Sequence, residues 1–292
     1  MPRDISYTVP PEYEGRKVVH FLRGYCGFSA RLMRKVKYAL KCNGEPTRTI
    51  DRLKSGDIIN VVIPDDDSLP EALHAEIDII YEDDDILVIN KSPFMAMHPT
   101  HNHQGDTLAN AVTAYLTEKG KNAAFRAVGR LDKGTSGVVV CALNPLSACK
   151  LSGKTEKEYY ALVKGNLCGE GRVDVPIYRP APMKTLRACS YELGVEPAVT
   201  NWKAEKSFEG ATLLSLRLET GRTHQIRVHM AFNGNVLAGD TMYGDFMPEI
   251  GHQLLHCRRC WLEHPVTGKK MEFEAEFPED FKKTMEYLAK SE

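Results

Sequence analysis

Long hydrophobic runs are missing from this sequence of 292 residues. No apolar segment approaches the roughly 20 residues that a membrane-spanning helix needs. The first residues lack the basic and then apolar layout of a secretory signal peptide. The sequence also contains neither a phosphate-binding P-loop nor the glycine fingerprint of a dinucleotide site. We therefore expect a soluble, cytoplasmic protein that has no contact with a membrane and uses no cofactor.

Complete metal-binding patterns are missing as well. His98, His101 and His103 lie in one loop, but no cysteine or carboxylate completes a recognisable ligand spacing. Cys257 and Cys260 form a single C-x-x-C, with no second pair. Side-chain alternation along a strand would place these two cysteines on opposite faces. Metal binding is disfavoured at both places, and free thiols in a reducing compartment explain the eight cysteines better than disulfides do.

Charge of one sign is concentrated in part of the chain, although the net charge is only -1. Between residues 14 and 63 there are 11 Lys and Arg against 4 Asp and Glu. Residues 65–85 contain 10 acidic residues and no Lys or Arg. This asymmetry indicates a basic module, an acidic connector and a polyanionic partner.

The basic module is predicted to contain two short helices followed by a strand, and residues 1–13 before it are expected to be a loose segment. Apolar spacing predicts helices within residues 15–40, with Ser29 as the N-cap of the second, and a strand within residues 53–63. The polar face of the second helix carries basic residues that could bind phosphates, although a merely solvated helix face is the alternative; they include Arg31, Arg34 and Lys35.

A second domain is expected from residue 76. Period-two patterns predict strands at 77–81, 86–90, 157–165, 212–218 and 271–277. Helices are expected after Thr107, after Asn144, after Thr223 as N-cap and after Pro278, whereas residues 172–210 read as loops and short strands.

Three positions carry candidate chemistry. Asp132 lies in a glycine-rich turn, 129–137, that leads into an apolar run typical of a buried strand. Arg130 would share a face with Asp132 if this segment were extended. Tyr159 lies in a predicted strand, and Arg227 in a predicted helix. The simpler alternatives are an Asp that bonds its own turn, a core aromatic and an exposed helical Arg.

These segments resemble the RluA/RluD-type pseudouridine synthases. The resemblance rests on Gly129-Arg130-Leu131-Asp132-Lys133-Gly134-Thr135-Ser136-Gly137, on the K-x-Y-x-A-x-V-x-G pattern at 157–165, and on Thr220-Gly221-Arg222-Thr223-His224-Gln225-Ile226-Arg227-Val228-His229. It implies that Asp132 is catalytic, that Tyr159 stacks on the uracil and that Arg227 pairs with Asp132. Arg130 and Arg222 are candidate substrate-binding residues, and Arg130 could fill the place of a uridine that leaves its stack or hold a phosphate. Gly129 and Gly134 depart from the residues usual in this branch of the family, which puts loop stiffness and RNA contacts in doubt.

Residues 14–64 are similar to the alpha-L RNA-binding domain of a ribosomal protein, carried by S-A-R-L-M-R-K, N-G and L-K-S-G-D. The resemblance implies an α+β catalytic domain over residues 76–292, with a mixed, largely antiparallel sheet flanked by helices. Residues 65–75 would be the linker. A monomer is expected.

A single carboxylate with a cation suits isomerisation better than glycoside hydrolysis, which normally needs two carboxylates and a water. The resemblance implies conversion of uridine to pseudouridine in RNA, with large-subunit ribosomal RNA as the expected substrate and transfer RNA as the alternative. Asp132 could act as nucleophile or as base. The alternative is a ribosome-associated RNA-binding protein or RNA chaperone that does not depend on catalysis.

Overall fold

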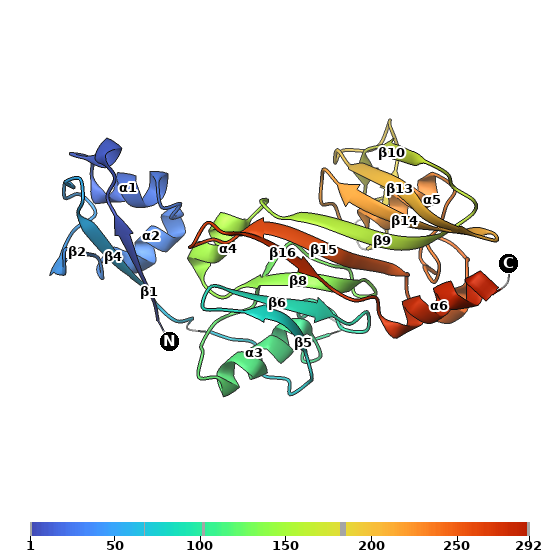
Figure 1. Cartoon of the computed structure of the whole chain (residues 1–292), viewed down its shortest axis with the longest axis horizontal. Coiled ribbons are helices and arrows are strands. Elements are labelled where there is room, and N and C mark those ends of the chain that lie inside the picture. The colour runs from blue at the N-terminus through green and yellow to red at the C-terminus, as the bar shows by residue number, and fades with distance from the viewer. Residues whose placement is uncertain (1, 67, 101–102, 182–184, 291–292) are drawn as a thin grey trace.

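Two structural units make up the chain in this computed structural model, which describes residues 2–66, 68–100, 103–181 and 185–290. Figure 1 shows a small N-terminal unit beside a long, twisted sheet that forms the rest of the molecule. Each unit has its own sheet and its own apolar core. Among the described residues, no helix has the length and apolar character needed to cross a bilayer.

The N-terminal unit packs two helices on a four-stranded sheet with the order β1-β4-β2-β3. Its elements are α1 (Val18–Gly24), α2 (Ala30–Val36), β1 (Arg3–Thr8), β2 (Lys41–Cys42), β3 (Glu45–Pro46) and β4 (Ile58–Ile63). The Ser29 hydroxyl accepts the Leu32 N–H at 3.1 Å, which confirms the predicted cap. The sequence predicted a loose segment over residues 1–13. Residues 3–8 instead form strand β1, which pairs with all six residues of β4.

The large sheet has the strand order β10-β13-β14-β9-β15-β8-β6-β5, with β7 paired to β8 and β16 paired to β15. Among the described strands of this sheet, β8 and β15 are the pair that runs parallel, so the expected mixed, largely antiparallel sheet is confirmed. The strands are β5 (Asp78–Glu82), β6 (Ile86–Lys91), β7 (Arg126–Val128), β8 (Ser136–Ala142), β9 (Glu156–Lys164), β10 (Glu170–Asp174), β13 (Val199–Phe208), β14 (Ala211–Leu218), β15 (Leu255–Glu263) and β16 (Lys270–Glu274), while β11 (Ile177–Tyr178) and β12 (Ala188–Cys189) form a separate hairpin.

Helices cover this sheet: α3 (Leu108–Glu118), α4 (Pro145–Leu151), α5 (Gln225–Phe232) and α6 (Glu279–Lys290). α4 begins where expected, because the Asn144 side chain accepts the Ser147 N–H at 2.9 Å. The ten-residue β13 is longer than the short strands expected within residues 172–210. Most of its side chains are polar and at least partly exposed, so the sequence carries little apolar signal there.

Gly137 permits the parallel contact in the middle of the sheet. Its φ is +106°, and an added Cβ would overlap the carbonyl of Cys257 on β15. All seven residues of β8 are buried, as the apolar run predicted. The turn before β8 is therefore anchored to a fully buried strand.

A bulge in β15 overturns one expectation. Cys257 pairs with Tyr159 and Arg259 pairs with Glu158, so Arg258 is an extra residue on this strand. The bulge turns Cys260 to the same side as Cys257, and both are fully buried in one apolar core. Simple alternation, which put the two cysteines on opposite faces, was wrong here.

The two units are joined by a buried contact. Leu146 of α4 is fully buried within the apolar core of the N-terminal unit. Arg3 of β1 reaches the β5–β6 turn, where its Nη2 lies 2.8 Å and its Nε 3.1 Å from the two carboxylate oxygens of Asp85. The Asp85 side chain is 3% exposed and also accepts a hydrogen bond from Asn144. The interface thus combines an apolar anchor with a bidentate ion pair.

Candidate active site

A cavity of about 800 Å³ opens among the turn before β8, strand β9 and the N-terminal end of α5. It is lined by predicted residues from well-separated parts of the chain: Arg130, Asp132, Tyr159, Arg222 and Arg227. The structure therefore brings together all five site residues predicted outside the N-terminal unit.

Asp132 occupies the turn between β7 and β8. Gly129 begins this turn with a φ of +76°, a conformation that suits glycine. The Thr135 N–H closes the turn by bonding to the Asp132 backbone carbonyl at 3.0 Å. The Asp132 side chain stays 25% exposed and does not cap its own turn, so it is available to the cavity. Residues 130–132 belong to no regular element, and Arg130 and Asp132 both line the cavity, so their placement on one face stays a prediction.

Arg227 holds a central position because it contacts two carboxylates. Its Nη1 lies 3.4 Å from Asp132 Oδ2. Its Nε and Nη2 bond to Asp240 at 2.7 and 2.8 Å, a bidentate pair in which Asp240 is fully buried. Burial opposes the charge of Arg227, but Asp240 and Asp132 outweigh it and raise the pKa of the guanidinium. A permanent positive charge therefore faces Asp132.

Tyr159 lies on the cavity side of β9 and is 8% exposed. Burial, reinforced by Cys257, Cys260 and Asp132, raises its pKa well above the ordinary value for tyrosine. The phenol is therefore neutral at physiological pH. Tyr160 packs in a different apolar cluster, as the alternation along the strand predicted.

The remaining predicted residues are exposed. Arg130 and Arg222 are exposed at the cavity, and Arg222 Nε donates to the Pro197 carbonyl at 3.1 Å. His98 and His103 also line the cavity, whereas His101 lies outside the described residues. Arg31, Arg34 and Lys35 are exposed on α2 in the other unit and do not line the cavity.

Lys91 was missed by sequence reasoning. It ends β6, is 1% exposed, and its Nζ lies 2.7 to 3.0 Å from three backbone carbonyls, those of Ser92, Met95 and Lys133. Burial lowers the pKa of Lys91 to about 7, while nearby Asp132 opposes this shift. Three acceptors use all three protons of an ammonium group. A single lysine at the end of an apolar strand was the available signal.

His224 was also missed as a site residue. It precedes α5 with a φ of +57°, a left-handed conformation that is uncommon for histidine. Its Nδ1 lies 2.9 Å from the hydroxyl of Tyr243. Since His224 is the N-cap and no side-chain cap is formed, the predicted capping by Thr223 was wrong. The left-handed residue sets the direction in which α5 leaves the cavity.

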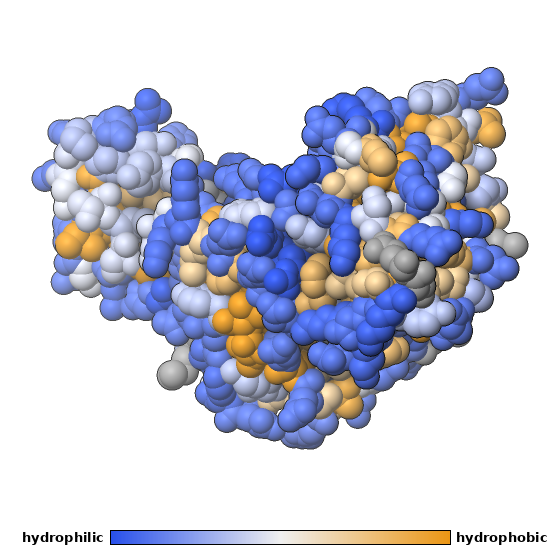
Figure 2. Space-filling model, turned by 45° about the vertical axis from the view of Figure 1, so that its right-hand side comes forward, coloured by the Kyte–Doolittle hydropathy of each residue, from blue (hydrophilic) through white to orange (hydrophobic). Residues whose placement is uncertain are grey.

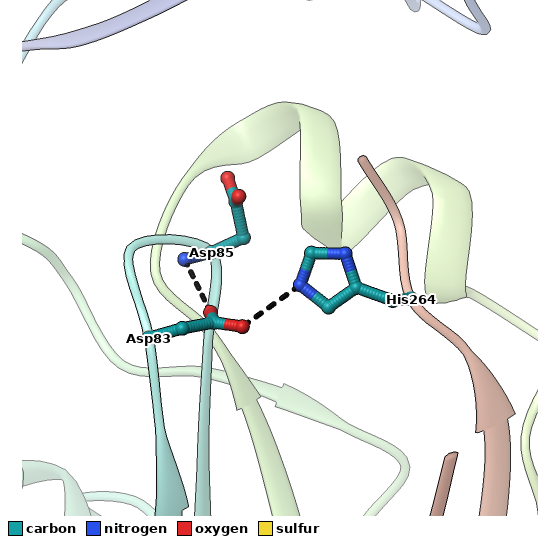
Figure 3. Close-up of side chains that lie close together, drawn as sticks. All are labelled: Asp83, Asp85 and His264. Atoms are coloured by element: carbon teal, nitrogen blue, oxygen red, sulfur yellow. Dashed lines mark hydrogen bonds and ion pairs between the residues drawn. The ribbon is translucent and has the colours of Figure 1, made fainter. Parts of the chain in front are cut away.

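One group in the described part of the chain has the spacing of a metal site: Asp83, Asp85 and His264 (Figure 3). Its ligand atoms are already used. Asp83 accepts the N–H groups of Asp85 and Ile86 at 2.7 and 2.8 Å and contacts His264 Nε2 at 2.9 Å. Asp85 is held by Arg3. The cluster lies at the contact between the two units, away from the cavity lining, and serves that contact.

Comparisons with known proteins place this geometry in a family. Residues 85–232 match the family model described as RNA pseudouridylate synthase, a range that contains Asp132, Tyr159 and Arg227. The chain belongs to the RNA pseudouridylate synthase family. It is 37% identical over 272 residues to the uncharacterised RNA pseudouridine synthase YjbO of Bacillus subtilis, covering 89% of this chain and 95% of that one.

Other relatives of this family agree. The chain is 36% identical over 262 residues to ribosomal large subunit pseudouridine synthase D of Vibrio vulnificus, covering 83% of this chain and 80% of the relative. The solved structure titled "Human RNA Pseudouridylate Synthase Domain Containing 4" superimposes on this chain with a TM-score of 0.59 and 22% sequence identity. The match covers 73% of this chain and 93% of the human chain, which supports the fold. This family member is thus an RNA pseudouridine synthase, an isomerase.

Proposed function

We propose that this chain converts uridines of large-subunit ribosomal RNA to pseudouridine, with Asp132 as the reacting carboxylate. The observation that carries the proposal is the ion pair at the cavity, where Arg227 faces Asp132 at 3.4 Å. The buried cation lies beside a carboxylate that can act as a nucleophile or as a base. The choice of ribosomal RNA is supported by relatives such as the Vibrio vulnificus protein.

The chemistry needs no second reacting carboxylate. Pseudouridine formation breaks the bond between C1′ of ribose and N1 of uracil and joins C1′ to C5. Glu219 also lines the cavity, but its carboxylate already pairs with Arg172 and accepts the Asn201 amide at 3.0 Å. Asp132 is thus the carboxylate that the cavity offers to the sugar, with the neutral Tyr159 ring beside it for stacking on uracil.

A uridine in folded RNA must leave its stack to enter the cavity. Arg130 is exposed next to Asp132, where its guanidinium could fill the vacated position. Arg222, also exposed, is placed to contact a phosphate at the rim. Both roles are proposed for substrate binding rather than for chemistry.

We further propose that residues 14–64 form an RNA-binding module, followed by a linker at 65–75 and a catalytic domain at 76–292. The exposed α2 residues Arg31, Arg34 and Lys35 supply positive charge. Figure 2 shows a broad hollow between the N-terminal unit and the lobe at the upper right, with mainly hydrophilic residues over its floor. A folded RNA could contact both lobes across this hollow.

The first test compares the intact protein with Asp132→Asn on unmodified ribosomal and transfer RNA transcripts and on immature ribosomal particles. Pseudouridine is mapped by carbodiimide adduct stops during reverse transcription. We expect new stops in large-subunit RNA with the intact protein and none with the variant, while RNA affinity is retained. Equal modification by the variant would contradict the role of Asp132. RNA binding without stops on any substrate would favour a non-catalytic protein.

The binding module is tested by the salt dependence of RNA affinity. Each phosphate contact contributes roughly 0.7 to 0.9 to the slope of log affinity against log salt. Combined Arg31→Ala, Arg34→Ala and Lys35→Ala should lower that slope by about 2. The matched control replaces Lys269, Lys270 and Lys283 by Ala, far along the chain, and should leave it unchanged. An unchanged slope in the first variant would contradict binding by α2.

A further inference from the structure

His224, whose backbone is left-handed, has a ring nitrogen at the cavity that bonds to no other described residue. His224 Nδ1 is engaged by Tyr243, whereas Nε2 has no hydrogen-bond partner among the described residues. The ring is half-buried and lines the cavity together with Asp132 and Arg227. A non-glycine residue held at positive φ in a cavity indicates a conformation that the surrounding structure imposes.

The hydrogen bonds around Tyr243 define the tautomer of His224. The Arg187 N–H donates to the Tyr243 oxygen at 2.9 Å, so this oxygen already acts as an acceptor. The single Tyr243 hydroxyl proton is then free to donate to His224 Nδ1. Burial lowers the pKa of His224, against an opposing effect of Asp132, so the ring is neutral at pH 7. A neutral ring whose Nδ1 accepts carries its proton on Nε2.

We propose that His224 is a catalytic residue that donates its Nε2–H to a carbonyl oxygen of the detached uracil. The inference rests on the proposed function of this site. When the C1′–N1 bond breaks, its electron pair stays on uracil and is shared through conjugation with both carbonyl oxygens. A preorganised donor aimed at this developing charge lowers the barrier. Tyr243 is the positioning residue that fixes the ring.

The proposal holds for either role of Asp132. If the carboxylate forms an ester bond to C1′, or instead removes the C2′ proton, uracil leaves with the same electron pair. Rotation of the base brings C5 to C1′, and the pair then forms the C5–C1′ bond. The ester bond to Asp132 breaks in the first route, and Asp132 returns the proton to C2′ in the second. The C5 proton is lost and N1 gains a proton, so the product is an isomer of the substrate. His224 stays neutral throughout and is unchanged at the end.

The test uses two substitutions that separate the halves of the ring. His224→Asn tolerates a left-handed backbone and keeps an amide near the Nδ1 position, but removes the Nε2 donor. His224→Gln places an amide N–H near the Nε2 position. On the RNA that the intact protein modifies, we expect His224→Asn to lower the single-turnover rate by about 100-fold with RNA affinity within 3-fold. His224→Gln should recover part of the rate.

The matched control is His74→Gln, at an exposed histidine paired with Glu118, which should leave the rate unchanged. A thiocarbonyl accepts hydrogen bonds poorly, so 2-thiouridine and 4-thiouridine at the target locate the contact. One of them should slow the intact protein and add no further loss to His224→Asn. Additive losses with both would overturn the proposal.

A second measurement examines the free protein. Long-range proton–nitrogen NMR at pH 7 should show His224 protonated at Nε2, and Tyr243→Phe should mix the tautomers. Protonation at Nδ1 in the intact protein would overturn the proposal. The experiment distinguishes failure of this inference from failure of the proposed function. If the proposed function is wrong, the intact protein forms no pseudouridine. If only this inference is wrong, the intact protein is active and His224→Asn forms pseudouridine at the same rate.

Discussion

Arg227 is bound more closely to Asp240 than to Asp132. Two bonds of 2.7 and 2.8 Å join it to Asp240, against a single contact of 3.4 Å to Asp132. Asp240 therefore fixes the guanidinium, and the looser contact leaves Asp132 free to approach a sugar. The site separates the carboxylate that orients the cation from the carboxylate that faces the cavity.

Replacing Asp240 should therefore affect stability as well as activity. Asp240→Asn leaves the buried Arg227 charge without its partner, which we expect to cost about 3 kcal/mol of unfolding free energy. The pseudouridine-forming rate should fall with it. Urea unfolding measures the first effect, with Asp245→Asn, at an exposed position, as the control. Equal midpoints for both variants would contradict this role of Asp240.

Arg3 should hold the N-terminal unit in place. Arg3→Met leaves the nearly buried Asp85 without its cation, and we expect a loss of about 2 kcal/mol together with faster proteolysis between the units. Adding Asp85→Asn should recover much of the loss, because the cost comes from the unpaired carboxylate. Arg23→Ala, in the last turn of α1, is the control. No recovery in the double variant would refute this explanation.

His256 should make the fold sensitive to acid. Burial lowers its pKa to about 4, below the value near 6.5 of an unfolded histidine. The unfolded chain therefore binds an extra proton between these values, and stability falls as the pH drops from 6.5 towards 4. The loss is at most about 3 kcal/mol.

Thermal unfolding at pH 7 and pH 5 measures this dependence. His256→Gln, which can still bond to Ser136 and the Ala275 carbonyl, should show a smaller difference between the two pH values. His20→Gln, at an exposed histidine, should retain the full difference. If His256→Gln and the intact protein lost stability equally, the assignment to His256 would be wrong.

Lys91 should stabilise the backbone next to Asp132, the proposed reacting carboxylate. Lys91→Met removes the donor shared by the carbonyls of Ser92, Met95 and Lys133, which we expect to cost about 3 kcal/mol. Because Lys133 follows Asp132, the rate should fall about tenfold while RNA affinity is retained. Lys54→Met, at an exposed turn, is the control. A stable and fully active Lys91→Met would exclude this role.

Sequence patterns predicted what depends on local periodicity. The buried strand after Asp132, the alternation of Tyr159 and Tyr160, and the cap at Ser29 follow from neighbours in the chain. Motifs identified residues far apart, such as Asp132 and Arg227, that the structure brings to one cavity.

The features that escaped prediction depend on tertiary contacts. The bulge at Arg258 changes which side of β15 Cys260 faces, and no local pattern marks it. The strand over residues 3–8 forms because β4 offers it a partner. Asp240 bonds to Arg227, which lies 13 residues away in the sequence, and Lys91 bonds to the carbonyl of Lys133, which lies 42 residues away. Periodicity says nothing about such partners.

The position of β15 has a consequence for synthesis on the ribosome. β8, which follows the Asp132 turn, and β9, which carries Tyr159, are not adjacent in the sheet but lie on either side of β15. A nascent chain that has reached residue 200 contains both of these segments yet lacks the strand that joins them. The cavity can therefore close only late in translation, and a chain interrupted before residue 255 would be an inactive product rather than a partly active one.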